Sequence, residues 1–203
     1  MVPNKTGYLA RRPQGRWRSS PPTNSAPPRS AMGVLCLKTG KNSMQSHERI
    51  VEKLNMAQIK FSLIHHDPLY TMDDVLTKTN FPIHEQIKCI ACTYKRDNYT
   101  IILIVGITPH GRLDYKKLAS HLGVSRSVVK IINHDEVSDL LHMPIGAIGL
   151  VTPDEISSEI ILSTAFKNNK TIYFGSGKND TTIMTTLDEL KKVVNIAFAE
   201  IEK

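Results

Sequence analysis

Two apolar runs dominate the pattern of hydrophobic and polar positions along the chain. The first covers residues 87–94 (IKCIACTY) and the second covers residues 100–106 (TIILIVG), with a polar break at residues 95–98 between them. Runs of this length, rich in β-branched residues and joined by a short polar segment, predict a β-hairpin at the centre of a sheet. Lys88 is the exception, because an ammonium group buried without a partner is strongly unfavourable. Two interpretations stay open: Lys88 reaches water from a sheet edge, or it faces a cleft that binds an anionic or carbonyl-rich group.

The segment before the hairpin predicts a helix, a strand and a short capped helix. Ser46 is expected to cap a helix that runs to Leu54, and residues 59–64 alternate enough to form a first strand. Thr71 and Asp74 have the spacing of a capping box, in which each residue's side chain accepts a hydrogen bond from the other's backbone N–H. A short helix should therefore follow Thr71.

The segment after the hairpin alternates between helices and strands. Asp114 and Gly123 should begin and end one helix. Thr186 and Glu189 form a second capping-box pattern, and apolar residues at helical spacing then predict a closing helix that continues to residue 201. Further elements are expected at residues 128–132, 134–141, 159–163, 171–174 and 181–184. These elements together predict an α/β domain with a mixed, mainly antiparallel sheet flanked by helices.

The N-terminal segment has a different composition from the rest of the chain. Residues 1–47 carry eight Lys and Arg and no acidic residue, so the remainder has 26 − 8 = 18 basic against 19 acidic residues. Six of the eleven prolines lie within the first 28 residues. Such a segment cannot bury enough apolar surface to order itself, so residues 1–45 are predicted to be a disordered basic Pro/Arg/Ser-rich extension, and residues 46–203 the domain. Organelle targeting, a nucleic-acid-binding arm, and translation from Met32 or Met44 are the alternatives.

Three cysteines, at positions 36, 89 and 92, are too few and odd in number for a disulfide framework, which favours a reducing compartment. The longest apolar stretch, residues 101–107, is too short to cross a bilayer. We therefore expect a cytoplasmic protein that does not bind membranes. Cys89 and Cys92 are spaced like a metal or redox pair, but no second pair completes a zinc site. A strand places residues three apart on opposite faces, so packing is the preferred interpretation for both thiols.

Residues 118–129 (LASHLGVSRSVV) resemble a helix-turn-helix, with an alanine, a glycine four residues later and a branched apolar residue beyond it. Arg126 would lie at the start of a recognition helix, and the basic extension would contact phosphates. Against this, four β-branched residues within 128–132 favour a strand. A DNA-binding regulator is therefore kept only as an alternative, and DNA is not the expected partner.

The segment Gly146-Ala147-Ile148-Gly149 is a cluster of small residues after Pro144. It is either a tight entry into a strand or a loop whose backbone N–H groups approach a ligand closely. His65 and His66 have no carboxylate or cysteine at ligand spacing, so neither indicates a metal site. Residues 175–178 (GSGK) lack the spacing and the following helix of a phosphate-binding P-loop.

The order of these pieces over residues 48–203 resembles the YbaK/prolyl-tRNA synthetase-associated domain, a family of trans-editing aminoacyl-tRNA deacylases. No single motif is specific, but their order is. The matching segments are His66-Asp67-Pro68, Ile87-Lys88, Thr108-Pro109, Leu113-Asp114-Tyr115-Lys116-Lys117-Leu118-Ala119, Leu122-Gly123, Gly146-Ala147-Ile148, Ile172-Tyr173-Phe174 and Gly175-Ser176-Gly177-Lys178.

The resemblance implies hydrolysis of the ester that joins a wrong amino acid to the 3′ end of a tRNA, typically a proline tRNA. It gives the catalytic role to Lys88, Gly146 and Ala147. The residues expected to bind substrate are His66, Ile148, Gly149, Asp180 and Thr182. No metal or cofactor is expected, and the partners would be aminoacyl-tRNA and prolyl-tRNA synthetase. The family loop usually carries a proline where this chain has Leu150, so a catalytically inactive module that binds tRNA or synthetase is the second alternative.

Overall fold

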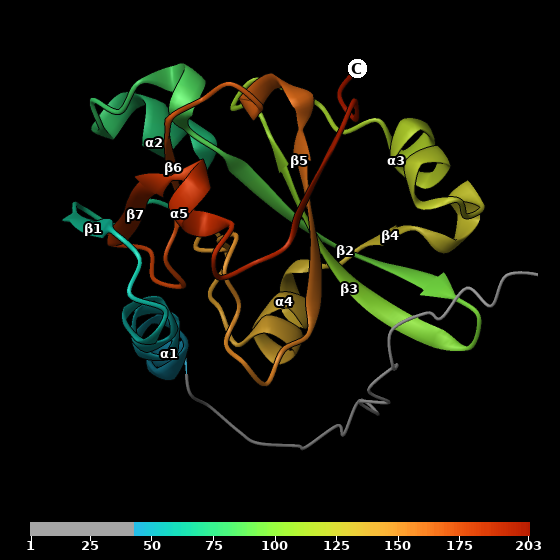
Figure 1. Cartoon of the computed structure of the whole chain (residues 1–203), viewed down its shortest axis with the longest axis horizontal. Helices are drawn as coiled ribbons and strands as arrows, with labels where there is room; N and C mark the ends of the chain where they lie inside the picture. Colours follow the sequence, from blue (N-terminus) through green and yellow to red (C-terminus); the bar gives the residue numbers. More distant parts are fainter. Residues whose placement is uncertain (1–42) are drawn as a thin grey trace, which may run out of the picture. The chain divides into compact units, whose positions relative to one another are not determined.

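The computed structural model describes residues 43–203, with side chains from Ser46 onward except that of His134 (Figure 1). The predicted extension lies almost wholly outside these residues. The helices are α1 (Ser43–Met56), α2 (Met72–Lys78), α3 (Tyr115–Leu122), α4 (His134–Leu141) and α5 (Leu187–Leu190). The strands are β1 (Phe61–His65), β2 (Lys88–Arg96), β3 (Tyr99–Ile107), β4 (Lys130–Ile131), β5 (Ser158–Ser163), β6 (Thr171–Gly175), β7 (Thr181–Thr186) and β8 (Ile196–Ala199). Short 3₁₀ turns cover Ile83–Glu85, Arg126–Val128 and Thr164–Phe166.

The larger sheet has five strands in the order β4-β2-β3-β5-β8. The predicted hairpin forms its centre: β2 and β3 pair antiparallel along their whole length, with Lys88 opposite Ile107. β4 is antiparallel to β2, whereas β3, β5 and β8 run parallel to one another. The predicted mixed α/β architecture is confirmed.

The smaller sheet is antiparallel, in the order β1-β7-β6. It meets the N-terminal end of β2, where the Ile87 N–H donates to the Tyr173 carbonyl at 2.9 Å. A single bridge also pairs Gln86 with Tyr173. The segment that opens β2 is therefore held between both sheets.

Two apolar cores lie on opposite faces of the larger sheet, because alternate residues of a strand point to opposite faces. The core between the two sheets includes Cys89 and Ala91 of β2, Phe174 of β6 and, from α1, Ile50. The second core takes Cys92, with Ile90 packed against it, and is covered by the buried face of α3. Figure 1 shows α3 on the side of the larger sheet away from the smaller sheet.

Local sequence signals predicted two helices correctly. Thr71 and Asp74 form the reciprocal capping box of α2. The Lys78 ammonium group holds the pKa of the Asp74 carboxyl far below its usual value. Hydrogen bonds from the backbone N–H groups of Tyr70 and Thr71 lower this pKa further. Asp114 accepts hydrogen bonds from the first turn of α3, and Gly123 ends that helix with φ = 67°.

The predicted closing helix is wrong. Only α5 forms after Thr186, and the chain then continues into β8, parallel to β5. Val194, Ile196 and Phe198 also fit the two-residue period of a strand, so the pattern was ambiguous. The free edge of β5 decides between helix and strand. Its backbone N–H and C=O groups need hydrogen-bond partners, and a strand at residues 196–199 supplies them whereas a helix would not.

Two smaller predictions also need correction. α1 begins at Ser43, so Ser46 lies inside the helix rather than capping it, and its hydroxyl donates to the carbonyl of His142. The predicted strand at residues 128–132 is reduced to β4, preceded by a 3₁₀ turn.

The helix-turn-helix interpretation is wrong, because no recognition helix follows α3. The Arg126 guanidinium instead stacks on the Tyr115 ring at 4.5 Å and donates to the Val129 carbonyl at 2.9 Å. Leu118, Ala119 and Leu122 are buried in the second core. The segment that resembled a DNA-binding motif is a helix and a strand packed onto the sheet.

The two described thiols are packing groups. Desolvation raises the pKa of Cys89 and of Cys92 to about 12, so neither is a thiolate at neutral pH. In a Cys36→Ser variant only the thiols of Cys89 and Cys92 remain. We expect a thiol reagent at pH 8 to label less than about a tenth of them in the folded protein, and both of them in guanidinium chloride. Ellman's reagent measures this directly. Rapid labelling of the folded protein would contradict the packing role.

Within residues 43–203, no helix is long and apolar enough to span a bilayer.

Candidate functional site

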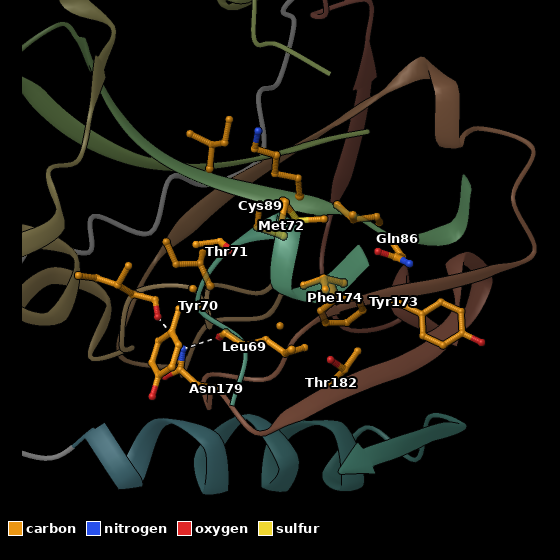
Figure 2. A pocket seen from close by; sticks show the side chains of 18 of the residues that line it. Leu69, Tyr70, Thr71, Met72, Gln86, Cys89, Tyr173, Phe174, Asn179 and Thr182 are labelled. Carbon is orange, nitrogen blue, oxygen red and sulfur yellow. Dashed lines mark hydrogen bonds between the residues drawn. The ribbon is translucent and has the colours of Figure 1, made fainter. Parts of the chain in front are cut away.

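A cleft of about 320 Å³ lies beside the first half of β2 (Figure 2). Its walls come from the segment before α2, from the start of β2, from residues 145–148 and from the ends of β6 and β7. β4 pairs only with Cys92 and Thr93, so the outer edge of β2 before these residues is left open toward the cleft. The cleft therefore exists because β4 is short.

That open edge presents a free backbone donor. The Ile87 N–H bonds to Tyr173, and the Ala91 carbonyl accepts from the Ile132 N–H at 3.0 Å, so both residues face outward from the hairpin. Antiparallel pairing alternates, which places the backbone N–H of Cys89 on the same outward edge. Among residues 43–203 it has no acceptor there. A ligand in the cleft can use it.

Lys88 is half-buried and lines the cleft. Its ammonium group makes no hydrogen bond or ion pair with any other residue that the structure describes. The second lysine of the lining, Lys178, lies 3.6 Å from the Asp180 carboxylate. No Asp or Glu lines the cleft. The cleft is therefore positive, which favours a ligand with phosphate or carbonyl oxygens.

The glycines of residues 146–149 are required by contacts within the protein. Gly146 has φ = 82°, and a Cβ there would lie 2.7 Å from the Tyr70 carbonyl oxygen. A Cβ on Gly149 would overlap the carbonyl oxygen of Gly175. The Ala147 N–H donates to Pro144, and its carbonyl accepts from Gly177. The small residues thus let this loop lie directly on neighbouring backbone.

The same loop still offers donors to the cleft. Gly146 and Ile148 both line it, and neither backbone N–H has an acceptor within residues 43–203. Ala147 is buried, and its N–H is already used. The two backbone groups on either side of Ala147 are therefore better placed to act on a ligand than Ala147 itself.

His66 forms a fixed pair with Thr182. Its Nδ1 lies 2.8 Å from the Asp67 carbonyl oxygen, which can only accept, so Nδ1 carries the proton in the neutral ring. Nε2, 2.9 Å from the Thr182 hydroxyl, then accepts from it. Both ring nitrogens are occupied, which makes His66 a positioning residue for Thr182 rather than a free general base.

Asp180 does not line the cleft, although its neighbours Asn179 and Thr181 do. The Thr181 hydroxyl donates to its carboxylate at 2.9 Å and, with Lys178, lowers its pKa. Its backbone carbonyl accepts from the N–H of His66 at 3.0 Å. Asp180 thus supports the His66 segment.

Asn179 holds the two ends of the cleft wall together. Its side-chain amide donates to the carbonyls of Leu69, at 3.0 Å, and Ile145, at 2.7 Å, as the dashed lines in Figure 2 show. These residues belong to segments about 76 positions apart in the sequence. One side chain therefore ties the segment before α2 to the glycine loop.

Aromatic rings and an amide form the opposite end of the cleft. Phe81 and Tyr173 stack with ring centroids 4.8 Å apart and planes at 21°, and His66 meets Phe81 edge-on. Gln86 lies beside them, and its Nε2 donates to the Phe81 carbonyl. Tyr173 belongs to one of the segments that resemble the editing family, but no pattern in the sequence marked Phe81 or Gln86. Gln86 stands two positions before Lys88, as members of one strand face do.

The structure brings five of the predicted site residues together and leaves three outside. Lining the cleft are His66, Lys88, Gly146, Ile148 and Thr182. Ala147, Gly149 and Asp180 are not among the lining residues. Within residues 43–203, no three His, Cys, Asp or Glu side chains lie close enough to hold a metal ion.

The protein is thus an α/β domain with an open cleft between its two sheets, and no Asp or Glu lines that cleft. Residues 66–193, more than half of the chain, match the family described as "Aminoacyl-tRNA editing domain". The chain belongs to that family.

Solved structures share the fold at low sequence identity. Hypothetical protein APE2540 is 18% identical to this chain in sequence, and the two structures superpose with a TM-score of 0.66. The match covers 76% of this chain and 99% of APE2540. A candidate trans-editing enzyme for prolyl tRNA synthetase is 14% identical to this chain, with a TM-score of 0.64. That match covers 81% of this chain and 99% of the candidate enzyme. No match is found among curated proteins.

Proposed function

We propose that this protein is an aminoacyl-tRNA deacylase that hydrolyses the ester of a mischarged tRNA. The observation that carries the proposal is Lys88, an unpaired cation in a cleft without any carboxylate. The membership in the editing family supports the role, and the name of the structural neighbour supports proline tRNA and prolyl-tRNA synthetase as the partners.

The chemistry needs little from side chains, because an aminoacyl ester is already activated. Water adds to the carbonyl carbon, the bond from that carbon to the ribose oxygen breaks, and the ribose oxygen receives a proton. Negative charge develops on the carbonyl oxygen during the attack. Backbone N–H groups and a cation placed around that oxygen stabilise it, each by roughly 3–4 kcal/mol when well aligned.

The residues present fit that requirement. The free N–H groups of Cys89, Gly146 and Ile148 and the ammonium group of Lys88 border one cleft. The Cys89 thiol is not a suitable nucleophile, because its pKa is raised to about 12. We therefore assign the attack to water, and the role of the protein to holding the ester and stabilising the oxyanion.

Size selection would come from the apolar part of the cleft. Leu69, Met72, Val75 and Ile145 line it, and the whole cavity of about 320 Å³ lies at the small end of ligand pockets. A small wrong amino acid fits such a space better than a larger cognate residue, as in double-sieve editing.

The test is a panel of mischarged tRNAs incubated with the full chain. We expect release of alanine, serine or cysteine from proline tRNA at least about 100-fold faster than spontaneous hydrolysis, with correctly charged prolyl-tRNA spared. Acid-gel analysis of labelled tRNA measures the rate. Absence of turnover on every mischarged tRNA, with tRNA or synthetase still bound, would instead establish a non-catalytic module.

A further inference from the structure

Gln86 holds a buried hydrogen-bond acceptor without a partner. The residue is 2% exposed and lines the cleft. Its Nε2 lies 2.8 Å from the Phe81 carbonyl oxygen. Because that oxygen can only accept, the amide cannot be flipped, and the other end must be Oε1. Within residues 43–203, Oε1 has no donor.

The amide oxygen lies toward Phe174, another residue of the cleft lining. Figure 2 shows the amide oxygen of Gln86 on the side of Phe174 and the nitrogen on the side of Tyr173. Buried polar groups are nearly always satisfied, so an orphan acceptor in a cleft wall indicates a donor that arrives with the ligand. The acceptor is neutral and no Asp or Glu is among the residues that line the cleft, which favours an uncharged N–H or O–H over an ammonium group.

The surroundings of Gln86 narrow the choice of donor. The Phe81–Tyr173 pair stands next to it, and both residues line the cleft. Aromatic side chains provide stacking surfaces for nucleobases, and an amide oxygen beside such a surface can accept from the amino group of adenine. The lining also contains two lysines and no Asp or Glu, a charge balance that suits a ligand with a phosphate group.

We infer that Gln86, Phe81 and Tyr173 bind the 3′-terminal adenine of the tRNA, with Gln86 Oε1 accepting a hydrogen bond from the adenine amino group. This inference rests on the proposed function. It assigns the aromatic end of the cleft to the base, and it leaves the apolar end around Met72 and Val75 to the amino acid.

The experiment compares tRNAs that end in adenosine with tRNAs that end in purine riboside, which lacks only the amino group. Each carries the amino acid released fastest by the wild-type chain. We expect kcat/KM to fall about tenfold for the purine riboside in the wild type, as for loss of one hydrogen bond in a buried site. In Gln86→Met, which keeps the volume but has no amide, both tRNAs should react within twofold of each other.

Three results would overturn the inference. The first is an equal rate for the two tRNAs in the wild type, which needs no variant and therefore does not depend on its folding. The second is a tenfold difference that persists in Gln86→Met. The third is a preference for seryl- over alanyl-tRNA that Gln86→Met abolishes, because the acceptor would then bind the amino-acid side chain.

A binding measurement separates this inference from the proposed function. Titration with adenosine 5′-monophosphate and with purine riboside 5′-monophosphate requires no catalysis. Tighter binding of the adenosine nucleotide that is lost in Gln86→Met supports adenine recognition even in an inactive protein. Equal binding of both nucleotides overturns it even in an active one.

Discussion

Replacing Lys88 by alanine should abolish most of the deacylation. The side chain carries an unpaired charge into a cleft that contains no carboxylate, so it has no structural partner to lose. Removing one group that stabilises an oxyanion typically lowers kcat by about 100- to 1,000-fold. We therefore expect kcat/KM of Lys88→Ala on the best mischarged tRNA to fall at least about 100-fold, with little change in the melting temperature.

Lys95→Ala is the matched control. Lys95 lies on the same strand, is exposed, and does not line the cleft. Lys95→Ala removes the same positive charge as Lys88→Ala, so any general effect of charge on tRNA binding appears in both variants. Lys95→Ala should retain activity within about twofold. Full turnover by Lys88→Ala would refute the catalytic role of Lys88, and with it the observation on which the proposed function depends.

Gly149→Ala should destabilise the fold more than Gly146→Ala, the other glycine substitution in the loop of residues 146–149. The new Cβ would overlap the Gly175 carbonyl oxygen, which is backbone and cannot move aside like the end of a flexible side chain. Overpacking a close contact costs about 1–3 kcal/mol, and more where backbone must shift. For a domain of this size each kcal/mol lowers the melting temperature by about 2–4 °C. We expect a fall of about 10 °C, measured by circular dichroism.

Gly123→Ala provides the comparison. Gly123 has a positive φ of 67°, but a Cβ there meets nothing within 4 Å. Gly123→Ala therefore carries only the cost of the left-handed backbone, about 1 kcal/mol or slightly more. The melting temperature should fall by about 2–4 °C. If Gly149→Ala were no less stable than Gly123→Ala, the loop would not lie directly on β6.

Local signals were sufficient for much of the fold. The hairpin, the capped helix α2 and helix α3 each depend on residues close together in the chain. Apolar runs, the Thr71–Asp74 box and the Asp114 and Gly123 caps act through neighbouring backbone groups, so their physics is contained in a short window of sequence.

The C-terminal segment shows where such windows fail. Residues 193–201 fit the helical and the strand period alike, and the available edge of β5 determines that β8 forms. The same limit applies to residues 126–132, of which only Lys130 and Ile131 pair with β2. A backbone partner that is distant in sequence decides both cases.

The amino-acid sequence was sufficient to show that Lys88 interrupts an apolar run, that residues 146–149 contain two glycines and an alanine, and that the ordered motifs resemble an editing domain. The surroundings of these residues became known only from the folded chain. It joined Lys88 to a cleft without carboxylates, placed Gly149 against Gly175, and brought Gln86 beside Phe81 and Tyr173. The reason is physical: an unpaired charge or acceptor is defined by the absence of partners, and partners come from every part of the folded chain.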